Sequence, residues 1–214
     1  MARSEKAEQT YQQILEASTK LFFTQGYEKT SIQDILDEVK MSRGVVYYYF
    51  KSKKEILDAI ASQRLDVMRS LIQETQAENA REKIAKILSM LIGDATDIPQ
   101  ETEEALFLEH MADPYIVLAN MQAQVNEAKL LLNLFEEGVR DGSIQTEYPL
   151  QVAELMFMLL STWLNPILFH RDLEQTKIHL KFVQQTLGKL GIDVLSDEMV
   201  DRTIENWKQL SYFN

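Results

Sequence analysis

The sequence predicts an all-α protein built from two domains, and three observations support this prediction. Apolar residues recur with a helical period along almost the whole chain. The 214 residues include only seven glycines and four prolines, which is too few for a sandwich or barrel of many short strands. Residues 1–64 hold ten Lys and Arg against nine Asp and Glu, whereas residues 65–214 hold twelve against twenty-four. We expect nine to ten helices, with an N-terminal domain over 1–52, a linking helix over 53–76 and a C-terminal domain over 77–214.

The composition excludes several functional classes. Hydrophobic residues make up 45% and charged residues 26% of the chain, which is the balance of a globular protein with a core. The absence of cysteine excludes disulfides, thiolate metal sites, iron–sulfur clusters and cysteine nucleophiles. No apolar run typical of a signal peptide is visible at the start, and the most apolar window, Leu155–Phe169, is too short and interrupted to span a bilayer. We therefore expect a soluble cytoplasmic protein.

The first two helices are bounded by a glycine and by a capping signal. The first is expected to stop at Gly26, where glycine can adopt the left-handed conformation that ends a helix. The second begins at Thr30 and Ser31, where either Ser31 with Asp34 or Thr30 with Gln33 has the spacing of an N-cap and its partner. The apolar faces of these helices comprise Tyr11, Ile14, Leu15, Ala17, Leu21, Phe22, Ile32, Ile35, Leu36 and Val39.

The third expected helix is short and the fourth is long. The third covers residues 42–50 and follows a break near Lys40. The fourth opens at Ser52, which has Glu55 at the spacing of a capping box, and it continues to about Gln76. Because this helix connects the two expected domains, we expect it to transmit movement between them.

The helical pattern continues through the C-terminal half. Asn79 and Glu82 have capping spacing before a fifth helix. Residues 93–100 are typical of a loop, and a short helix is expected over about 101–111.

A proline marks the start of the next helix. Asp113 is the expected N-cap and Pro114 the first helical residue, and the helix should run to Gly138 or Gly142. Further helices are expected from Pro149 to a stop or kink at Pro166, over about 173–190, and from Ser196 or Asp197 to about Tyr212.

One short segment of the acidic chain is strongly basic. Residues 40–54 contain five bases and no acid, and they include the third of three short helices, which is a helix-turn-helix pattern. A helix fits the major groove of DNA, where Arg43 could hydrogen-bond guanine or a phosphate and Gly44 would let the backbone approach closely. The alternatives are that the basic run is only a solvated face, or that the three helices are only a packing unit.

Three consecutive tyrosines give the third helix an unusual surface. Tyr47, Tyr48 and Tyr49 project over about 200° of a helix, so one of them must pack inward while the others face outward. An exposed tyrosine suits hydrogen bonding to the sugar–phosphate backbone and contact with thymine. Tyr47 could instead be mainly a core residue. Lys51, Lys53 and Lys54 follow at the start of the fourth helix, where unbonded backbone N–H groups also favour a phosphate.

About 45 residues of this region resemble the DNA-binding domain of the TetR family of bacterial transcriptional regulators in order and spacing. The resemblance rests on Ile14-Leu15-Glu16-Ala17, Leu21-Phe22, Gly26-Tyr27, Thr30-Ser31-Ile32, Ile35 and the run from Ser42 to Lys53. It implies that Thr30 and Ser31 touch phosphate and that Tyr47, Tyr49 and Lys53 hold the DNA backbone. It also implies that the major groove is faced by Arg43, Gly44, Val45 and Tyr48.

Three departures from the family pattern concern the turn and the recognition helix. Val39 and Lys40 replace a small residue and a glycine, which predicts a slightly strained turn with an added positive charge. Val45 replaces a frequent Thr or Ser, so it can touch a thymine methyl group but cannot hydrogen-bond. Tyr49 replaces a frequent histidine. These departures bear on which operator is bound rather than on the mode of binding.

The resemblance also implies a homodimer. The helices over about 149–169 and 173–190 are the expected interface, since the window Leu155–Phe169 is apolar nearly all round. The alternative is that this window is the central core helix of one chain. Two-fold symmetry would place two recognition helices about 34–36 Å apart on a palindromic operator.

A ligand pocket between helices of the C-terminal domain completes the predicted regulator. Methionine and aromatic residues are expected to line the pocket, together with two polar residues. Methionine and aromatic residues at helical spacing, however, more commonly belong to the hydrophobic core. The candidates are Met90, Phe107, Met111, Met121, Phe135, Met158 and Trp163, with His110 and Asn165 as polar points. We expect a repressor that is released from DNA by a small hydrophobic effector, which could be cationic because the domain is acidic.

An all-helical enzyme and a protein-binding adaptor are the rival interpretations. His110, His170 and His179 lack the spacing of two metal ligands on one helical face. No glycine-rich phosphate loop or nucleophile elbow is present. We therefore expect no catalytic residue, no metal and no cofactor, and double-stranded DNA as the partner.

Overall fold

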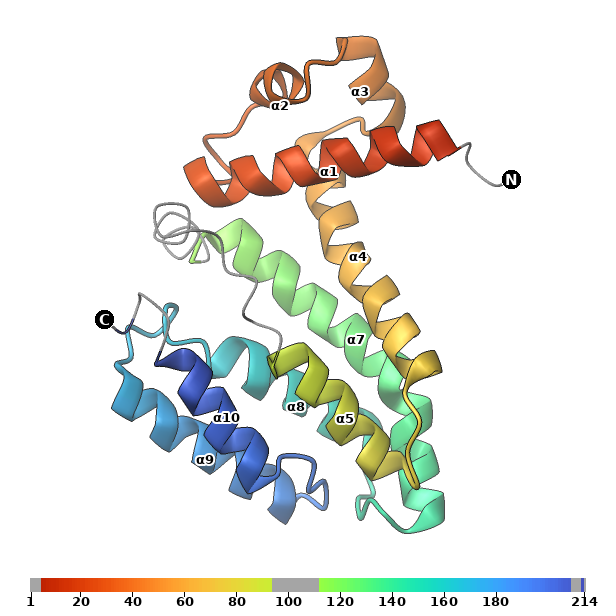
Figure 1. Cartoon of the computed structure of the whole chain (residues 1–214), viewed down its shortest axis with the longest axis vertical. Helices are drawn as coiled ribbons and strands as arrows, with labels where there is room; N and C mark the ends of the chain where they lie inside the picture. The colour runs from red at the N-terminus through yellow and green to blue at the C-terminus, as the bar shows by residue number, and fades with distance from the viewer. Residues whose placement is uncertain (1–4, 94–111, 209–212, 214) are drawn as a thin grey trace.

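The computed structural model describes residues 5–93, 112–208 and 213. Within these ranges the secondary structure is entirely helical, with nine α-helices and one π-helix and no strand. Figure 1 shows a small N-terminal group of helices at one end, a larger bundle at the other, and one long helix running between them. The predicted all-α architecture is confirmed. Across the described part of the chain, no helix is both long enough and apolar enough to cross a membrane.

The N-terminal group contains the helices that the sequence predicts. They are α1 (Glu5–Gln25), α2 (Ile32–Val39) and α3 (Arg43–Tyr49), followed by the long connecting helix α4 (Lys53–Glu74). Gly26 ends α1 with a φ of 89°, which is the left-handed conformation expected there. In Figure 1, α2 and α3 lie at the end of the molecule farthest from the C-terminal bundle, with α1 beneath them.

One predicted capping box forms and the other forms only in part. Ser31, rather than Thr30, caps α2, because its hydroxyl accepts from the Asp34 N–H while the Asp34 carboxylate accepts from the Ser31 N–H at 2.7 Å. At α4 the Ser52 hydroxyl accepts from the Glu55 N–H at 3.1 Å. The Glu55 carboxylate, however, accepts from the N–H of Lys51 at 2.7 Å, one residue before the expected partner.

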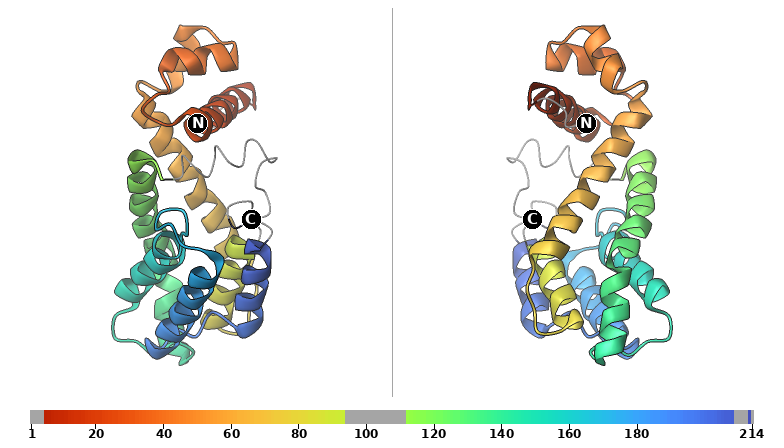
Figure 2. Two further views of the ribbon diagram at one scale, coloured as in Figure 1. Left: turned by 90° about the vertical axis from the view of Figure 1, so that its left-hand side faces the viewer. Right: turned by 90° about the vertical axis from the view of Figure 1, so that its right-hand side faces the viewer.

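The larger bundle is formed by the remaining helices. They are α5 (Ala80–Gly93), α7 (Pro114–Asp141), α8 (Pro149–Phe157), the π-helix η1 (Met158–Trp163), α9 (Leu173–Lys189) and α10 (Asp197–Trp207). The expected helix over 101–111 and most of the expected loop over 93–100 lie outside the described residues. Figure 2 shows α4 and α7 reaching up from the bundle to the N-terminal helices, and these two helices contact each other.

The end of α7 distinguishes between the two predicted stop signals. Gly142 ends the helix with a φ of 80°, whereas Gly138 lies inside the helix and is buried. A Cβ at Gly138 would lie 2.5 Å from the Cδ1 atom of Ile144. Gly138 is therefore required for the close approach of the chain that follows the helix.

The helix that begins at Pro149 changes character before it ends. Its second part, η1, has the wider π-type geometry, and the Leu164 N–H donates to the Leu159 carbonyl five residues earlier at 2.9 Å. The helix stops before Pro166, as expected.

The buried apolar side chains form two separate cores. The first unites α1, α2, α3, the start of α4 and Ile116 from the first turn of α7. The second lies in the bundle and contains residues of α4, α5, α7, α8, α9 and α10. We call these the N-terminal core and the C-terminal core. The start of α7 thus packs into the N-terminal core, although it follows the bundle helix α5 in sequence.

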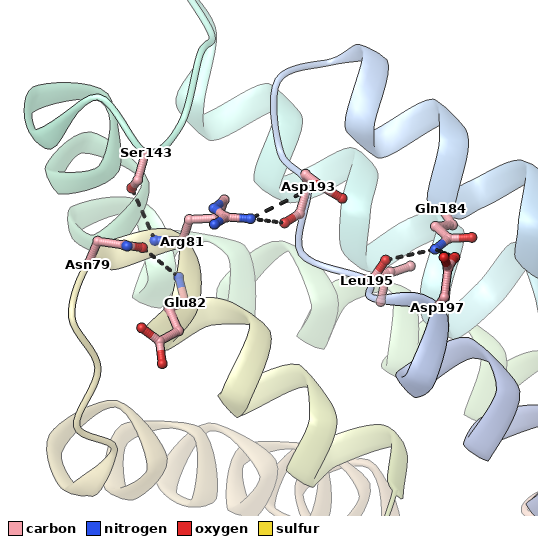
Figure 3. A network of polar contacts seen from close by, with 8 residues as sticks. All are labelled: Asn79, Arg81, Glu82, Ser143, Gln184, Asp193, Leu195 and Asp197. Atoms are coloured by element: carbon pink, nitrogen blue, oxygen red, sulfur yellow. Dashed lines mark hydrogen bonds and ion pairs between the residues drawn. The ribbon is translucent and has the colours of Figure 1, made fainter.

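A polar network holds the end of the bundle that is remote from the N-terminal helices (Figure 3). The Arg81 guanidinium donates to the Asp193 carbonyl at 3.1 Å, and the Arg81 N–H donates to the Ser143 hydroxyl at 3.3 Å. Gln184 donates to the Leu195 carbonyl and the Asp197 carboxylate, each at 2.9 Å. These contacts join α5, the α7–α8 turn, α9 and α10 and therefore anchor the bundle.

Candidate nucleic-acid interface and ligand cavity

Helix α3 has one buried face and one solvent face. Val46 is fully buried, and Phe50, just past the helix end, is 4% exposed in the N-terminal core. The opposite side presents Arg43, Gly44, Val45 and Tyr48 to solvent, and Tyr48 is 74% exposed. The four residues predicted to face the major groove are therefore on the surface at the tip of the molecule (Figure 1).

The three tyrosines have three different environments. Tyr49 is the one that packs inward, since it lies against the N-terminal core with its ring centroid 6.2 Å from that of Tyr11. Tyr48 points outward. Tyr47 is half-buried, and the Arg43 guanidinium lies over its ring at 5.1 Å and hydrogen-bonds its hydroxyl at 3.4 Å. This contact one helical turn away orients Arg43 before any partner binds.

Two of the predicted backbone-contact residues are engaged inside the domain. The Thr30 side chain is 1% exposed, and its hydroxyl donates to the Gly26 carbonyl at 2.8 Å. The Lys53 ammonium donates to the carbonyls of Tyr27, Glu28 and Thr30 and lies 4.2 Å from the centre of the Tyr27 ring. These two residues fasten the α1–α2 connection to the first turn of α4, and their contact with the DNA backbone stays a prediction.

Ser31 is exposed, but its hydroxyl serves the capping box. It donates to the Asp34 carboxylate at 2.8 Å. Hydrogen bonds from the Ser31 N–H and hydroxyl lower the pKa of Asp34 below its ordinary value of 3.8. The N-terminus of α2 therefore already carries a carboxylate at neutral pH.

The cations of the basic segment lie around the tip. Lys40, Arg43, Lys51 and Lys54 are exposed, and α3 has no acidic residue in its first turn. Lys54 pairs with Asp58 at 2.7 Å, one turn along α4. Lys40 occupies the left-handed region with φ 53° and ψ 37°, which confirms the strain expected where the family pattern has glycine.

A cavity of about 750 Å³ lies between the N-terminal helices and the bundle. Its described lining is mostly apolar, with Glu127, only 2% exposed, as the charged residue. Thr19, Gln63, Asn120 and Ser161 are the other polar lining residues. The apolar lining consists of Phe22, Phe23, Leu57, Ile60, Ala61, Val67, Met68, Leu88, Leu91, Ile116, Ala119, Phe157, Leu160 and Trp207.

This lining differs from the predicted one. Phe107, His110 and Met111 lie outside the described residues, and the other six candidates do not line the cavity. They are Met90, Met121, Phe135, Met158, Trp163 and Asn165. Phe135 is a fully buried core residue, and Met90 and Met158 are 43% and 42% exposed. The cavity depends on how α1 packs against α4 and how α10 packs against α5. The periodicity of a single helix does not indicate either packing.

Helices α8, η1 and α9, and the segment that joins η1 to α9, carry exposed apolar side chains. We call this set the apolar cluster; it comprises Leu155, Met158, Phe169, Ile178 and Phe182. The same helices also contribute Met156, Phe157 and Val183 to the C-terminal core. The window from 155 to 169 is therefore neither wholly core nor wholly surface.

The described residues include no group of three or more His, Cys, Asp or Glu side chains that could hold a metal ion.

Comparison with known proteins gives a consistent result. Residues 14–60 match the family model described as bacterial regulatory proteins, tetR family. The chain is 25% identical over 187 residues to the HTH-type transcriptional regulator YfiR of Bacillus subtilis (strain 168), covering 81% of this chain and 91% of YfiR. It is 36% identical over 64 residues to the A-factor receptor protein of Streptomyces griseus, covering 30% of this chain but only 23% of the receptor.

Solved structures share the fold. A TetR-family transcriptional regulator from Mesorhizobium loti has a TM-score of 0.58 at 21% identity, over 86% of this chain and 97% of that one. RolR in complex with resorcinol has a TM-score of 0.56 at 16% identity, over 94% of this chain and 96% of that one. The sequence relatives named here are regulators or receptors rather than enzymes.

Proposed function

We propose that the chain is a homodimeric repressor of a palindromic operator. The match of residues 14–60 to the tetR family model and a relative that is a transcriptional regulator support this proposal. A small hydrophobic molecule in the cavity releases it from the DNA. The single observation that carries this proposal is the solvent face of α3, where Arg43, Gly44, Val45 and Tyr48 are exposed together opposite the buried Val46.

Each exposed residue of α3 has a distinct role in this proposal. Arg43 hydrogen-bonds a guanine edge, and Tyr47 beneath it holds the guanidinium in place and reaches the sugar–phosphate backbone. Val45 and Tyr48 contact thymine methyl groups or the backbone, and Gly44 permits the close approach of the helix.

The positive charges around α3 supply the electrostatic part of binding. Lys40 and Lys51 are exposed at the tip and approach phosphates. Ser31 adds a hydroxyl at the edge of this surface. Thr30, Lys53 and Tyr49 act indirectly, because they fix the conformation of the domain.

A second copy of the chain covers the apolar cluster on α8, η1 and α9. Ile178 and Phe182 are the exposed side chains that most need such a partner, since they are 67% and 55% exposed. Two-fold symmetry then places two α3 helices on successive turns of the major groove, about 34–36 Å apart.

The effector is expected to be small and largely apolar. The cavity volume of about 750 Å³ suits a drug-sized molecule, and its wall is mainly aliphatic and aromatic. RolR, which shares this fold, was crystallised with resorcinol, and a relative at 24% identity is named as a fatty acid metabolism regulator protein. Both names support a small organic effector.

The test is salt-dependent binding of the full-length protein to duplex DNA. Arg43→Ala should weaken binding to a selected duplex about 10- to 100-fold, since one base contact contributes about 1–3 kcal/mol. Arg69→Ala is the matched control, because Arg69 is an exposed arginine in the connecting helix that pairs with Asp66. Equal effects of the two changes, or no DNA binding by the wild type, would refute the proposal.

A further inference from the structure

The cavity is built jointly by the two parts of the molecule. On one side, Thr19, Phe22 and Phe23 of α1 line it together with Leu57 and Ile60 near the start of α4. On the other side the lining comes from the bundle, with Leu88, Leu91, Phe157, Leu160, Ser161 and Trp207. We call these the N-terminal side and the C-terminal side of the cavity. A molecule that fills the cavity therefore touches the DNA-binding domain itself.

Helix α1 links the cavity to the recognition helix. Phe22, near its C-terminal end, lines the cavity and is 1% exposed in the N-terminal core. Tyr11, three turns earlier, packs its ring against Tyr49 of α3 at 6.2 Å and against Phe50 at 5.2 Å. Because α1 is a continuous helix between these positions, a shift at Phe22 is carried to the base of α3.

The start of α7 also lines the N-terminal side of the cavity, together with α1. Ile116 and Ala119 line the cavity and also pack against the N-terminal core. One turn earlier, the Asp113 carboxylate accepts from the Tyr27 N–H at 3.1 Å. The Tyr115 ring lies 5.0 Å from the Tyr27 ring.

A further hydrogen bond closes this junction. The Tyr115 hydroxyl donates to the Glu28 carboxylate, and this bond, together with the negative charge of Glu28, raises the pKa of Tyr115. The turn that follows α1 is thus held against the start of α7 directly beside the cavity.

We propose that α1 responds directly to the effector. A group that occupies the space between Phe22 and Ala119 separates α1 from α7 and so displaces α3. This inference rests on the proposed function and adds that the two sides of the cavity have different roles. Groups of the effector on the N-terminal side control release of the protein from DNA. Groups on the C-terminal side contribute only to the affinity of the effector for the protein. The physical reason is close packing behind the cavity wall. Phe22 and Ile116 are 1% and 3% exposed in the N-terminal core, so a group that presses on them moves a helix instead of compressing the core.

The absence of cysteine makes a ligand-free test possible, since one introduced cysteine is a unique target. Ala119→Cys places a thiol on the N-terminal side, and Ser161→Cys places one on the C-terminal side as the matched control. Each variant is treated with methyl or benzyl methanethiosulfonate, whose sulfinate leaves as the thiolate forms a mixed disulfide. Mass spectrometry measures the labelling, and circular dichroism and sedimentation check that fold and oligomeric state are kept.

The readout is affinity for a duplex selected by the wild-type protein. The benzyl group on position 119 should weaken binding about tenfold or more, within the range of ordinary allosteric coupling, and dithiothreitol should restore it. The methyl group there and the benzyl group on position 161 should each change affinity less than about threefold. Ala119→Phe, which needs no labelling, should reproduce the loss.

The outcomes separate this inference from the proposed function. Equal losses at positions 119 and 161, or full affinity in both labelled Ala119→Cys and Ala119→Phe, would overturn the direct response of α1 while leaving a DNA-binding regulator. Failure of the unlabelled wild type to bind any duplex would instead refute the proposed function, and the inference would fall with it.

Discussion

A substitution at Lys53 tests whether this side chain stabilises the N-terminal domain, as its hydrogen bonds indicate, or contacts the DNA backbone, as the family resemblance implies. Its ammonium donates to three backbone carbonyls, and two of them belong to residues, Tyr27 and Thr30, that are 6% and 1% exposed. Lys53→Met keeps most of the aliphatic stem and removes the donors. A hydrogen bond from a charged group contributes about 1.5–3 kcal/mol, but Lys53 is only half-buried, so water replaces part of the loss. We therefore expect the free energy of unfolding to fall by about 2 kcal/mol.

The adjacent residue supplies a matched control. The Lys54 side chain is 72% exposed and pairs with Asp58 on the same helix, so Lys54→Met should change stability by less than about 0.5 kcal/mol. Urea unfolding of both full-length variants measures the difference, and the salt dependence of DNA binding provides the second readout. If Lys53 were a phosphate contact instead, Lys53→Met would keep wild-type stability and lower the salt slope by about one. That pair of results would refute the structural role.

Three further changes test local features of the fold. Lys40→Gly should raise the unfolding free energy by about 0.5–1 kcal/mol by relieving the left-handed backbone, whereas Lys40→Ala should give no such gain in urea unfolding. Gly138→Ala should lower the thermal midpoint because its Cβ would meet Ile144 at 2.5 Å, whereas Gly188→Ala, with open space around it inside α9, should raise it. Asp34→Asn should destabilise the protein at pH 7, and the gap to wild type should close as pH falls below about 4; a gap independent of pH would contradict the capping role. The sign follows from the lowered pKa of Asp34, whose contribution is present above the unfolded pKa and is lost as pH falls through the folded one.

Local signals predict the helices of this chain well. The boundaries at Gly26, Ser31, Pro114 and Ser196 follow from caps and breakers, which act within one turn. Gly138 and Gly142 are equivalent as local signals, and only the packing of Ile144 decides between them. The π-type turns of η1 have no simple local signature, so they could not be predicted.

The candidate DNA-binding surface is likewise predictable from the sequence only in part. The exposure of Arg43 and Tyr48 follows from the helical period once Val46 is assigned to the core. The engagement of Lys53 depends on a contact with a loop more than twenty residues away, which its position in the basic segment does not indicate.

The cavity is the least predictable feature. Its wall combines α1, α4, α5, α7, α8, η1 and α10, so no single helix contains its pattern. Methionines such as Met90 and Met158 are chemically suitable but lie elsewhere on the surface. A pocket between domains is set by tertiary packing, and sequence periodicity reports only which face of each helix is buried.

The most direct test of the central claim is selection of bound duplexes from a random DNA pool by the full-length wild-type protein. We predict enrichment of a two-fold symmetric sequence whose half-sites are centred about one helical turn apart, or a multiple of it. The Arg43→Ala variant should lose discrimination at one symmetric pair of positions while retaining salt-dependent binding. Recovery of sequences without symmetry, or the same sequence with and without Arg43, would contradict reading of DNA by the exposed face of α3.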